Sequence, residues 1–165
     1  MCRSKSVERK ARVMAEEGEM APDFDLPTED GRIRLSKLRG KPVVVYFYPK
    51  DDTSGCTAEA RDFSALYPEF KAAGAEVIGI SPDSPTSHGK FRKKHDLSVA
   101  LASDEDKAVA QAYGVWVEKS MYGRKYMGVE RSTFLIDKAG RIAKSWRKVK
   151  VPKHAQDVLK FLNNL

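Results

Sequence analysis

Short apolar runs and longer segments with helical spacing alternate along this chain. Residues 43–48 and 76–81 contain apolar runs of strand length, which is typical of strands buried on both faces. Between them Phe63, Leu66 and Phe70 recur at helical spacing, and Gly74 is suited to end that helix. The order strand, helix, strand predicts an α/β fold.

Shorter elements are predicted before and after this central unit. Residues 21–26 and 32–35 have strand character, and the turn residues 30–31 between them predict a hairpin. Further along, residues 99–102 predict a short strand and residues 104–113 a short helix.

The rest of the chain completes the predicted sheet. Residues 83–85 form a helix start, because cap residues precede a proline there. Residues 132–137 and 141–146 flank Gly140 and predict a second hairpin, and residues 158–165 carry apolar side chains on one face of a docking helix. We therefore expect an α/β fold whose central mixed β-sheet is flanked by helices, with an N-terminal β-hairpin as an addition.

Length and composition indicate one globular domain. The chain has 165 residues, of which 41% are hydrophobic and 32% are charged. We expect a domain at residues 18–165, preceded by a polar extension at residues 1–17. No apolar run approaches the roughly 18 residues that a membrane span requires, and the N-terminus lacks the apolar stretch of a secretory signal. These features predict a cytoplasmic protein without membrane association.

The net charge of +7 raises the question of nucleic-acid binding. Basic residues gather near the N-terminus and again at residues 138–153, but Trp146 is the only aromatic residue among the second group. Base stacking needs interleaved aromatic side chains, so a solvated basic surface is favoured over a specific nucleic-acid site.

The chain has two cysteines, Cys2 and Cys56, which cannot form a disulfide framework. Its three histidines show no metal-ligand spacing, so we expect neither a metal nor another cofactor.

Cys56 follows a buried strand and a polar loop, and therefore lies in the first turn of the predicted helix. The free N–H groups and dipole of a helix start favour a negative charge, so this thiol should ionise more readily than a free one. An internal cysteine is more often a small buried apolar residue; the polar loop favours a nucleophile, a ligand or a redox centre here.

The residues around Cys56 carry a more specific signal. Residues 49–57 match the P-x-x-x-T-x-x-C motif of peroxiredoxins, and the wider stretch resembles their bacterioferritin-comigratory, or Q-type, subfamily. Further matching pieces follow in the same order, at residues 21–24, 79–81, 113–116 and 131–137. The resemblance covers roughly residues 15–165.

The resemblance implies a thioredoxin fold and a thiol-dependent peroxidase activity toward hydrogen peroxide and organic hydroperoxides. Cys56 matches the peroxidatic cysteine, Thr53 the hydroxyl that contacts thiolate and peroxide, and Pro49 the ring that shields the pocket. Arg131 matches the active-site arginine, and Glu59 matches a recurrent acidic residue that supports the active-site loop. Taken alone, Thr53 would be a cap or turn residue and Arg131 a surface charge.

The chemistry of these residue types agrees with the resemblance. Attack on an O–O bond needs a thiolate, a positioned peroxide and donors for the oxygen that leaves with negative charge. Arg131 is the best candidate cation, because a guanidinium stays charged and offers several donors. The Thr53 hydroxyl can accept from the peroxide, and backbone N–H groups at Gly55 and Cys56 can complete the pocket. The product on the protein would be a Cys56 sulfenic acid.

One departure from the subfamily pattern decides the expected mechanism. Many members carry a resolving cysteine five residues after the peroxidatic one, where this chain has Arg61. We therefore expect a one-cysteine mechanism, in which thioredoxin, glutaredoxin or a low-molecular-weight thiol reduces the sulfenic acid. Cys2 is an alternative resolving thiol, although a terminal thiol without a catalytic role is favoured. By analogy with the subfamily we expect a monomer.

Two other functions remain open from the residues alone. A peroxide sensor or redox relay would use the same Cys56 but pass its oxidation to a partner protein. A basic nucleic-acid-associated protein would require a salt-dependent binding curve. A thiol–disulfide oxidoreductase is disfavoured, because residues 56–59 lack the second cysteine of a Cys-x-x-Cys motif.

Overall fold

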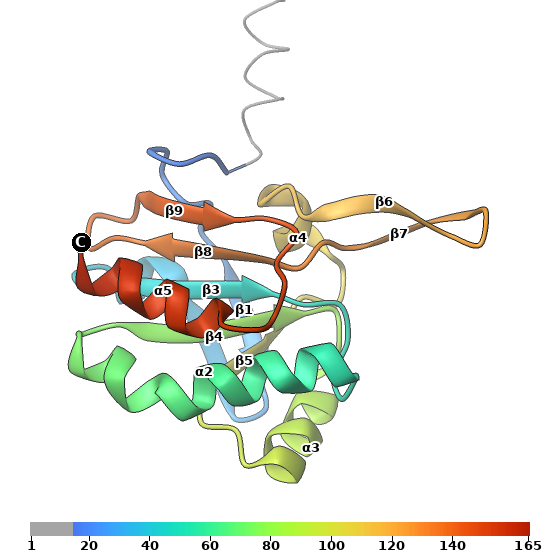
Figure 1. Cartoon of the computed structure of the whole chain (residues 1–165), viewed down its shortest axis with the longest axis horizontal. Coiled ribbons are helices and arrows are strands. Elements are labelled where there is room, and N and C mark those ends of the chain that lie inside the picture. The colour runs from blue at the N-terminus through green and yellow to red at the C-terminus, as the bar shows by residue number, and fades with distance from the viewer. Residues whose placement is uncertain (1–14) are drawn as a thin grey trace, which may run out of the picture.

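The computed structural model describes residues 15–165, so Cys2 and most of the predicted N-terminal extension lie outside the described residues. A five-stranded sheet in the order β5-β4-β3-β8-β9 forms the centre of the molecule (Figure 1). Strands β3, β4 and β5 run parallel, whereas β8 is antiparallel to β3 and β9 is antiparallel to β8. The predicted mixed sheet is therefore confirmed. The strands of this sheet are β3 Val43–Phe47, β4 Glu76–Ser81, β5 Ala100–Ser103, β8 Ser132–Ile136 and β9 Ile142–Trp146.

Helices cover both faces of the sheet. The two long crossover helices α2 and α3 join the parallel strands, and together with α5 they pack on one face. The short helix α4 packs on the other face beside the N-terminal segment and the predicted hairpin of β1 and β2. These elements are β1 Asp25–Thr28, β2 Gly31–Arg34, the 3₁₀ helix η1 Leu35–Leu38, α2 Ser54–Ala72, α3 Pro85–His95, α4 Ala108–Ala112 and α5 His154–Asn163.

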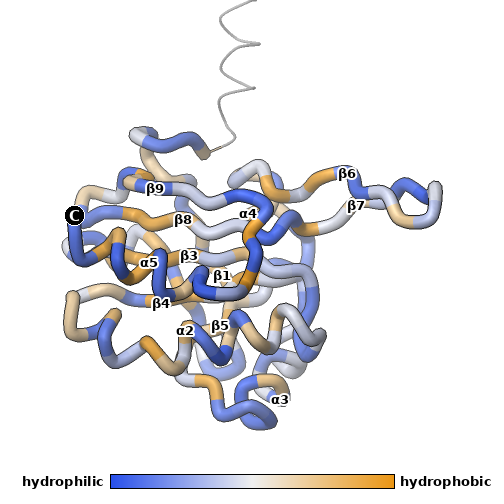
Figure 2. The backbone as a smooth tube through the Cα atoms, in the orientation of Figure 1, coloured by the Kyte–Doolittle hydropathy of each residue, from blue (hydrophilic) through white to orange (hydrophobic). Residues whose placement is uncertain are grey.

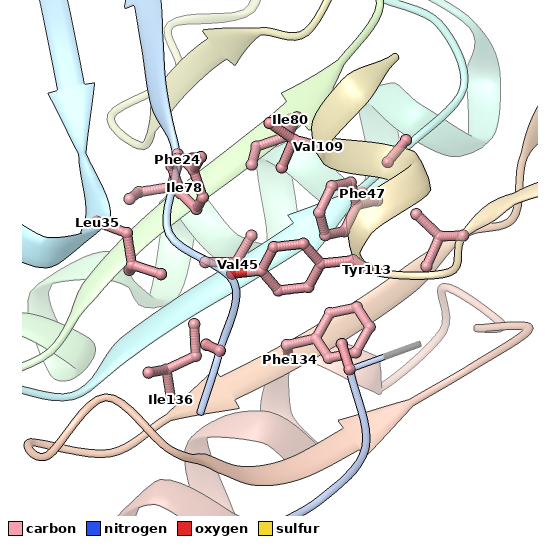
Figure 3. Packing of buried hydrophobic residues seen from close by; sticks show 14 of the residues in the cluster. Phe24, Leu35, Val45, Phe47, Ile78, Ile80, Val109, Tyr113, Phe134 and Ile136 are labelled. Atoms are coloured by element: carbon pink, nitrogen blue, oxygen red, sulfur yellow. The ribbon is translucent and has the colours of Figure 1, made fainter. Parts of the chain in front are cut away.

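Strand β3 lies at the middle of the core because both of its faces are apolar. Val45 and Phe47 point to one face, where they meet Tyr113 and Phe134 (Figure 3). Tyr46 points to the other face and stacks on Phe63 of α2, with ring centroids 4.7 Å apart. The position of β3 between two layers fixes where its carboxyl end, and the loop that follows it, must lie.

The structure contains one hairpin that the sequence pattern did not predict. Strands β6 (Trp116–Met121) and β7 (Arg124–Val129) pair antiparallel and form an arm that extends away from the sheet (Figure 1). Its turn residues Tyr122 and Gly123 have φ angles of 53° and 77°, the left-handed pair that a tight two-residue hairpin turn requires. Most residues of the arm are exposed on both faces, and its hydropathy is mixed (Figure 2), so no apolar alternation marks these strands.

Two predicted boundaries differ from the observed ones. The early strand begins at Asp25 rather than at residue 21. The helix expected at residues 104–113 is only five residues long, because the Asp104 carboxylate accepts hydrogen bonds from the N–H groups of Val109 and Ala110 and caps the helix there. None of the helices in residues 15–165 is long and apolar enough to cross a membrane.

Candidate active site

Cys56 lies in the first turn of α2, as the sequence predicted. The chain leaves β3 after Phe47, crosses a loop of residues 49–53 and enters the helix with Thr53 as the N-cap residue. The backbone N–H of Thr57 donates to the Thr53 carbonyl at 2.8 Å, which closes the first turn around Cys56. The residue is only 1% exposed. Its sulfur therefore lies at the positive end of the helix dipole, in a site nearly closed to solvent.

The sheet register brings Arg131 to this sulfur from a distant part of the sequence. Strand β8 is antiparallel to β3, and Ser132 pairs with Phe47 at the carboxyl end of β3. Arg131 directly precedes β8, so its side chain reaches the first turn of α2. Its Nη2 donates to Cys56 Sγ at 3.2 Å, across 75 residues of sequence. The guanidinium is thus the cation beside the sulfur that the sequence predicted.

Glu59 fixes the other side of this guanidinium. It lies three residues after Cys56 on the same face of α2, and its Oε1 accepts from Arg131 Nη1 at 2.6 Å. Glu59 is 1% exposed, and its Oε2 has no hydrogen-bond partner within residues 15–165. Burial raises the pKa of Glu59 to about 7 and outweighs the opposing effect of Arg131.

Gly55 leaves the space that the guanidinium occupies. A Cβ atom at this position would lie 3.2 Å from Arg131 Nη2 and 3.9 Å from its Cζ. The first of these distances is tighter than an ordinary van der Waals contact. The absence of a side chain at Gly55 therefore allows Arg131 to approach Cys56 closely.

Thr53 and Pro49 both lie in the loop before α2. The Thr53 hydroxyl is exposed and donates to the Lys50 carbonyl at 2.9 Å, so within the described chain its hydrogen is directed at the loop and not at the sulfur. Its oxygen lone pairs remain able to accept a hydrogen bond from a ligand. Pro49 is half-buried where the loop leaves β3.

Three side chains near this site carried no recognised signal in the sequence. Lys119 of the unpredicted arm donates to the Val129 carbonyl at 2.5 Å, and burial together with the positive charge of Arg131 lowers its pKa. Asp51 is buried beneath the loop, where it contacts His88 of α3. The acidic residues 51–52 resembled cap residues in the sequence, and no periodicity connects Asp51 to a histidine 37 positions away.

The arrangement supports one kind of chemistry. Cys56 is the only cysteine in residues 15–165, so that part of the chain provides no partner for a disulfide. Arg61, five residues after Cys56, is exposed on α2. A buried sulfur, held at a helix start and bonded to a guanidinium, is suited to react as a thiolate and to have negative charge neutralised beside it.

Comparisons with known proteins agree with this geometry. The AhpC/TSA family matches residues 18–145. Peroxiredoxin Bcp of Bacillus subtilis is 48% identical over 149 residues, which cover 90% of this chain and 95% of that protein. Peroxiredoxin Bcp of Escherichia coli K12 is 42% identical over 146 residues, 88% of this chain and 94% of that protein. The solved structure of the bacterioferritin comigratory protein of Xanthomonas campestris superposes with a TM-score of 0.85 at 43% identity, and the match covers 90% of this chain and 98% of that one.

Proposed function

Because this chain belongs to the AhpC/TSA family and is a peroxidase of the peroxiredoxin type, we propose that Cys56 is the nucleophile that attacks the peroxide. The observation that carries this proposal is the contact of 3.2 Å between Arg131 Nη2 and Cys56 Sγ at the start of α2. It combines two sources of positive potential on a single sulfur, and Cys56 is the only sulfur nucleophile in residues 15–165.

The reaction would proceed in one displacement. The Cys56 thiolate attacks one oxygen of the hydroperoxide, an S–O bond forms, and the O–O bond breaks. The electron pair of that bond leaves on the other oxygen, which takes a proton to become water or an alcohol. The sulfur is oxidised to a sulfenic acid and the peroxide is reduced by two electrons.

Arg131 and the first turn of α2 would stabilise the negative charge during this step. The guanidinium neutralises the thiolate before attack and can donate to the oxygen that leaves. Glu59 would act as a positioning residue, because its bond of 2.6 Å holds the far side of the guanidinium. The backbone N–H groups at Gly55 and Cys56 would supply further donors.

Thr53 and Pro49 would shape the pocket that receives the peroxide. The Thr53 hydroxyl has its hydrogen on the Lys50 carbonyl, which leaves the oxygen free to accept from the peroxide O–H. Pro49 has no N–H group, so it would cover the sulfur without attracting water.

The substrates would be hydrogen peroxide and organic hydroperoxides. The solved structure from Xanthomonas campestris was described in terms of alkyl peroxide reduction by that protein, and its similarity to this chain supports the same class here. The sulfenic acid would be reduced by an external thiol, from thioredoxin, glutaredoxin or a small thiol. A cytoplasmic location and a monomeric state stay predictions.

Intact mass measurement after one equivalent of hydrogen peroxide tests the proposal. We expect the reduced protein to gain one oxygen that a sulfenic-acid trap captures, and Cys56→Ser to gain nothing. Cys2→Ser serves as the matched control and should behave like the unaltered chain. Loss of two hydrogens or a covalent dimer would instead identify Cys2 as a resolving thiol, and an unchanged mass would contradict the peroxidase assignment of Cys56.

A turnover assay separates the enzyme from a sensor or relay that uses the same site. An enzyme should cycle repeatedly with at least one of thioredoxin, glutaredoxin or glutathione. Fast oxidation of Cys56 followed by poor turnover with all three would favour the relay.

A further inference from the structure

The burial of Cys56 creates a conflict between two steps of the proposed function. Attack on the peroxide needs the closed pocket, in which Cys56 is 1% exposed and bonded to Arg131. Reduction of the sulfenic acid needs a second sulfur to approach within bonding distance of the same atom, about 2 Å. The loop of residues 49–53 and the first turn of α2 must therefore open between the two steps. The contacts that hold this loop closed therefore influence the rates of both steps.

Asp51 holds the loop from beneath through four polar contacts. Its Oδ1 accepts from the Tyr48 hydroxyl at 2.6 Å, and its Oδ2 accepts from the Ser87 hydroxyl at 2.8 Å. The same Oδ2 lies 2.8 Å from His88 Nδ1. The fourth contact fixes the backbone, because the Asp51 N–H donates to Asp83 Oδ2 at 2.8 Å. Asp83 Oδ2 in turn accepts from the Ser81 hydroxyl at 2.7 Å. Asp51 is thus anchored to Tyr48 directly after β3, to β4 through Asp83, and to α3.

The second ring nitrogen of His88 ties the contact with Asp51 to the sheet. His88 Nε2 is 3.1 Å from the carbonyl of Ala102 in β5, and a carbonyl only accepts, so Nε2 must carry a hydrogen. The His88 and Asp51 side chains are almost completely buried, at 0% and 4% exposed, so the pair is shielded from water.

The neighbouring Asp52 provides a second and weaker anchor at the surface. It has a left-handed backbone with φ of 60°, and its carboxylate accepts from Lys94 at 2.7 Å and contacts His95 at 2.8 Å. Both partners lie on α3, the same helix that carries His88. This outer contact is exposed, so solvent screens it and it contributes less than the buried one.

We propose that Asp51 and His88, supported by Tyr48 and Ser87, form a clamp that keeps the loop of residues 49–53 closed over Cys56 and thereby sets the balance between peroxide reduction and thiol-dependent regeneration. These are positioning residues, because their hydrogen bonds within the described chain converge on Asp51 and not on the Cys56 sulfur. The inference rests on the proposed function of Cys56. It adds that α3, a helix without catalytic residues, determines how often the sulfur becomes accessible.

The regeneration step defines what an open clamp should accelerate. The thiolate of the external thiol attacks the sulfur of the sulfenic acid, an S–S bond forms, and the S–O bond breaks. The oxygen leaves as water after it takes a proton. A second thiol then reduces the mixed disulfide and releases Cys56 in its reduced form. The first attack is on Cys56 Sγ and requires that sulfur to be exposed, whereas the second is on the sulfur of the external thiol and releases Cys56.

Two mild substitutions weaken the clamp without leaving a buried charge unpaired. Tyr48→Phe removes one donor to Asp51 and keeps the ring, and Ser87→Ala removes another. We expect either change to slow the oxidation of Cys56 by hydrogen peroxide several-fold and to speed the reaction of the sulfenic acid with glutathione several-fold. Stopped-flow fluorescence and rapid-quench intact mass measure the two rates separately.

Further variants separate positioning from a general loss of stability. Asp51→Asn can still donate to His88 and accept from Tyr48, so it should stay close to the unaltered protein, whereas Asp51→Ala should show the largest opposite shifts. Ile136→Val, at the far end of β8 from the site, is the matched control for lowered stability. It should leave the ratio of the two rates unchanged.

The outcomes distinguish this inference from the proposed function. Loss of all peroxide reaction in Cys56→Ser together with opposite shifts in the clamp variants supports both. The clamp is wrong if Tyr48→Phe and Ser87→Ala change neither rate, or slow both to the same extent, or if Ile136→Val reproduces their pattern. A reaction with peroxide that persists in Cys56→Ser would overturn the proposed function, and the clamp inference, which rests on it, would fall as well.

Discussion

Arg131 is the residue on which the proposed chemistry depends most. One of its nitrogens donates to Cys56 Sγ and another to Glu59, with contacts of 3.2 and 2.6 Å. A lysine carries the same charge but lacks the planar fork that reaches both partners. Substitution by lysine or by a neutral residue can therefore separate the effect of the positive charge from the effect of the oriented hydrogen-bond donors.

We predict that Arg131→Lys slows the oxidation of Cys56 by roughly 10-fold and that Arg131→Gln slows it by about 100-fold or more, since removal of one preorganised donor costs about 2.7–4 kcal/mol of transition-state stabilisation. The rate constant with hydrogen peroxide in stopped flow measures the effect. Arg124→Lys in the exposed turn region of the arm is the control. Equal rates for all three variants would contradict the role of Arg131.

Gly55 tests the same contact from the opposite side. The Cβ atom of Gly55→Ala would lie 3.2 Å from Arg131 Nη2, so the guanidinium must shift by a few tenths of an ångström. We predict a loss of a few-fold in the rate of peroxide reduction with little change in thermal stability. Gly31→Ala is the matched control, because a Cβ there meets nothing within 4 Å. A rate that stays at the level of the control would mean that the guanidinium position is not critical.

At this scale the sequence led to part of the candidate site. Cys56 was predictable because a buried strand and a polar loop precede it and a helix follows it. Arg131 and Glu59 were predicted from a family resemblance. The contact between Asp51 and His88 was not predictable, because it depends on how α3 packs against a loop 37 residues earlier. Lys119 was missed because it lies on an arm that left no pattern in the sequence.

Strand β4 contains a glycine that the packing of two other elements requires. A Cβ atom on Gly79 would lie 2.7 Å from the Tyr46 ring and 2.9 Å from Leu101. Both neighbours are fully buried, so neither can move away without disturbing the core.

We predict that Gly79→Ala lowers the free energy of unfolding by about 2–3 kcal/mol, as expected for overpacking in a core. Gly89→Ala in α3 is the matched control. Its Cβ would meet only the Glu29 side chain, closest at 2.6 Å from Oε2, which is the flexible end of an exposed side chain and can move away. Alanine also has a better helix propensity by about 1 kcal/mol. Denaturant unfolding followed by circular dichroism measures both, and equal stabilities would contradict this account.

Elements were predictable where burial imposes a pattern. Strands β3 and β4, helix α2 and the hairpin of β8 and β9 all appear close to their expected bounds. The arm of β6 and β7 was missed because water contacts both of its faces, so hydrophobic alternation is not selected there. Helix α4 was predicted too long because the side-chain cap from Asp104 determines its start.

Two buried titratable groups make the stability of the whole molecule depend on pH, in opposite directions. Burial raises the pKa of Glu59 to about 7 and lowers the pKa of His154, which contacts Thr133 at 2.7 Å, to about 4. The folded state therefore prefers both groups in their neutral forms. Glu59 contributes full stability below its unfolded pKa and loses it as the pH rises through 7, whereas His154 loses stability as the pH falls below 6.5.

We predict that Glu59→Gln becomes more stable relative to the unaltered protein as the pH rises from 5 to 8. The change between these two pH values should reach about 2.5 kcal/mol, from about 1.4 kcal/mol per pKa unit. His154→Asn should instead gain stability relative to the unaltered protein as the pH falls from 6.5 to 4.5. Urea unfolding at each pH measures these differences. A difference that does not vary with pH would show that the corresponding group titrates alike in the folded and unfolded chain.

The arm of β6 and β7 also offers a site for attachment of the protein to a surface. Tyr122 at its turn is 98% exposed, and residues 120–125 contribute no side chain to either buried cluster. A short tag inserted between Tyr122 and Gly123 would therefore stand clear of the folded body. The protein could be immobilised on a biosensor surface through that tag in a single orientation, and the peroxide and thiol reactions could then be followed on one population of molecules by exchanging the solution above them.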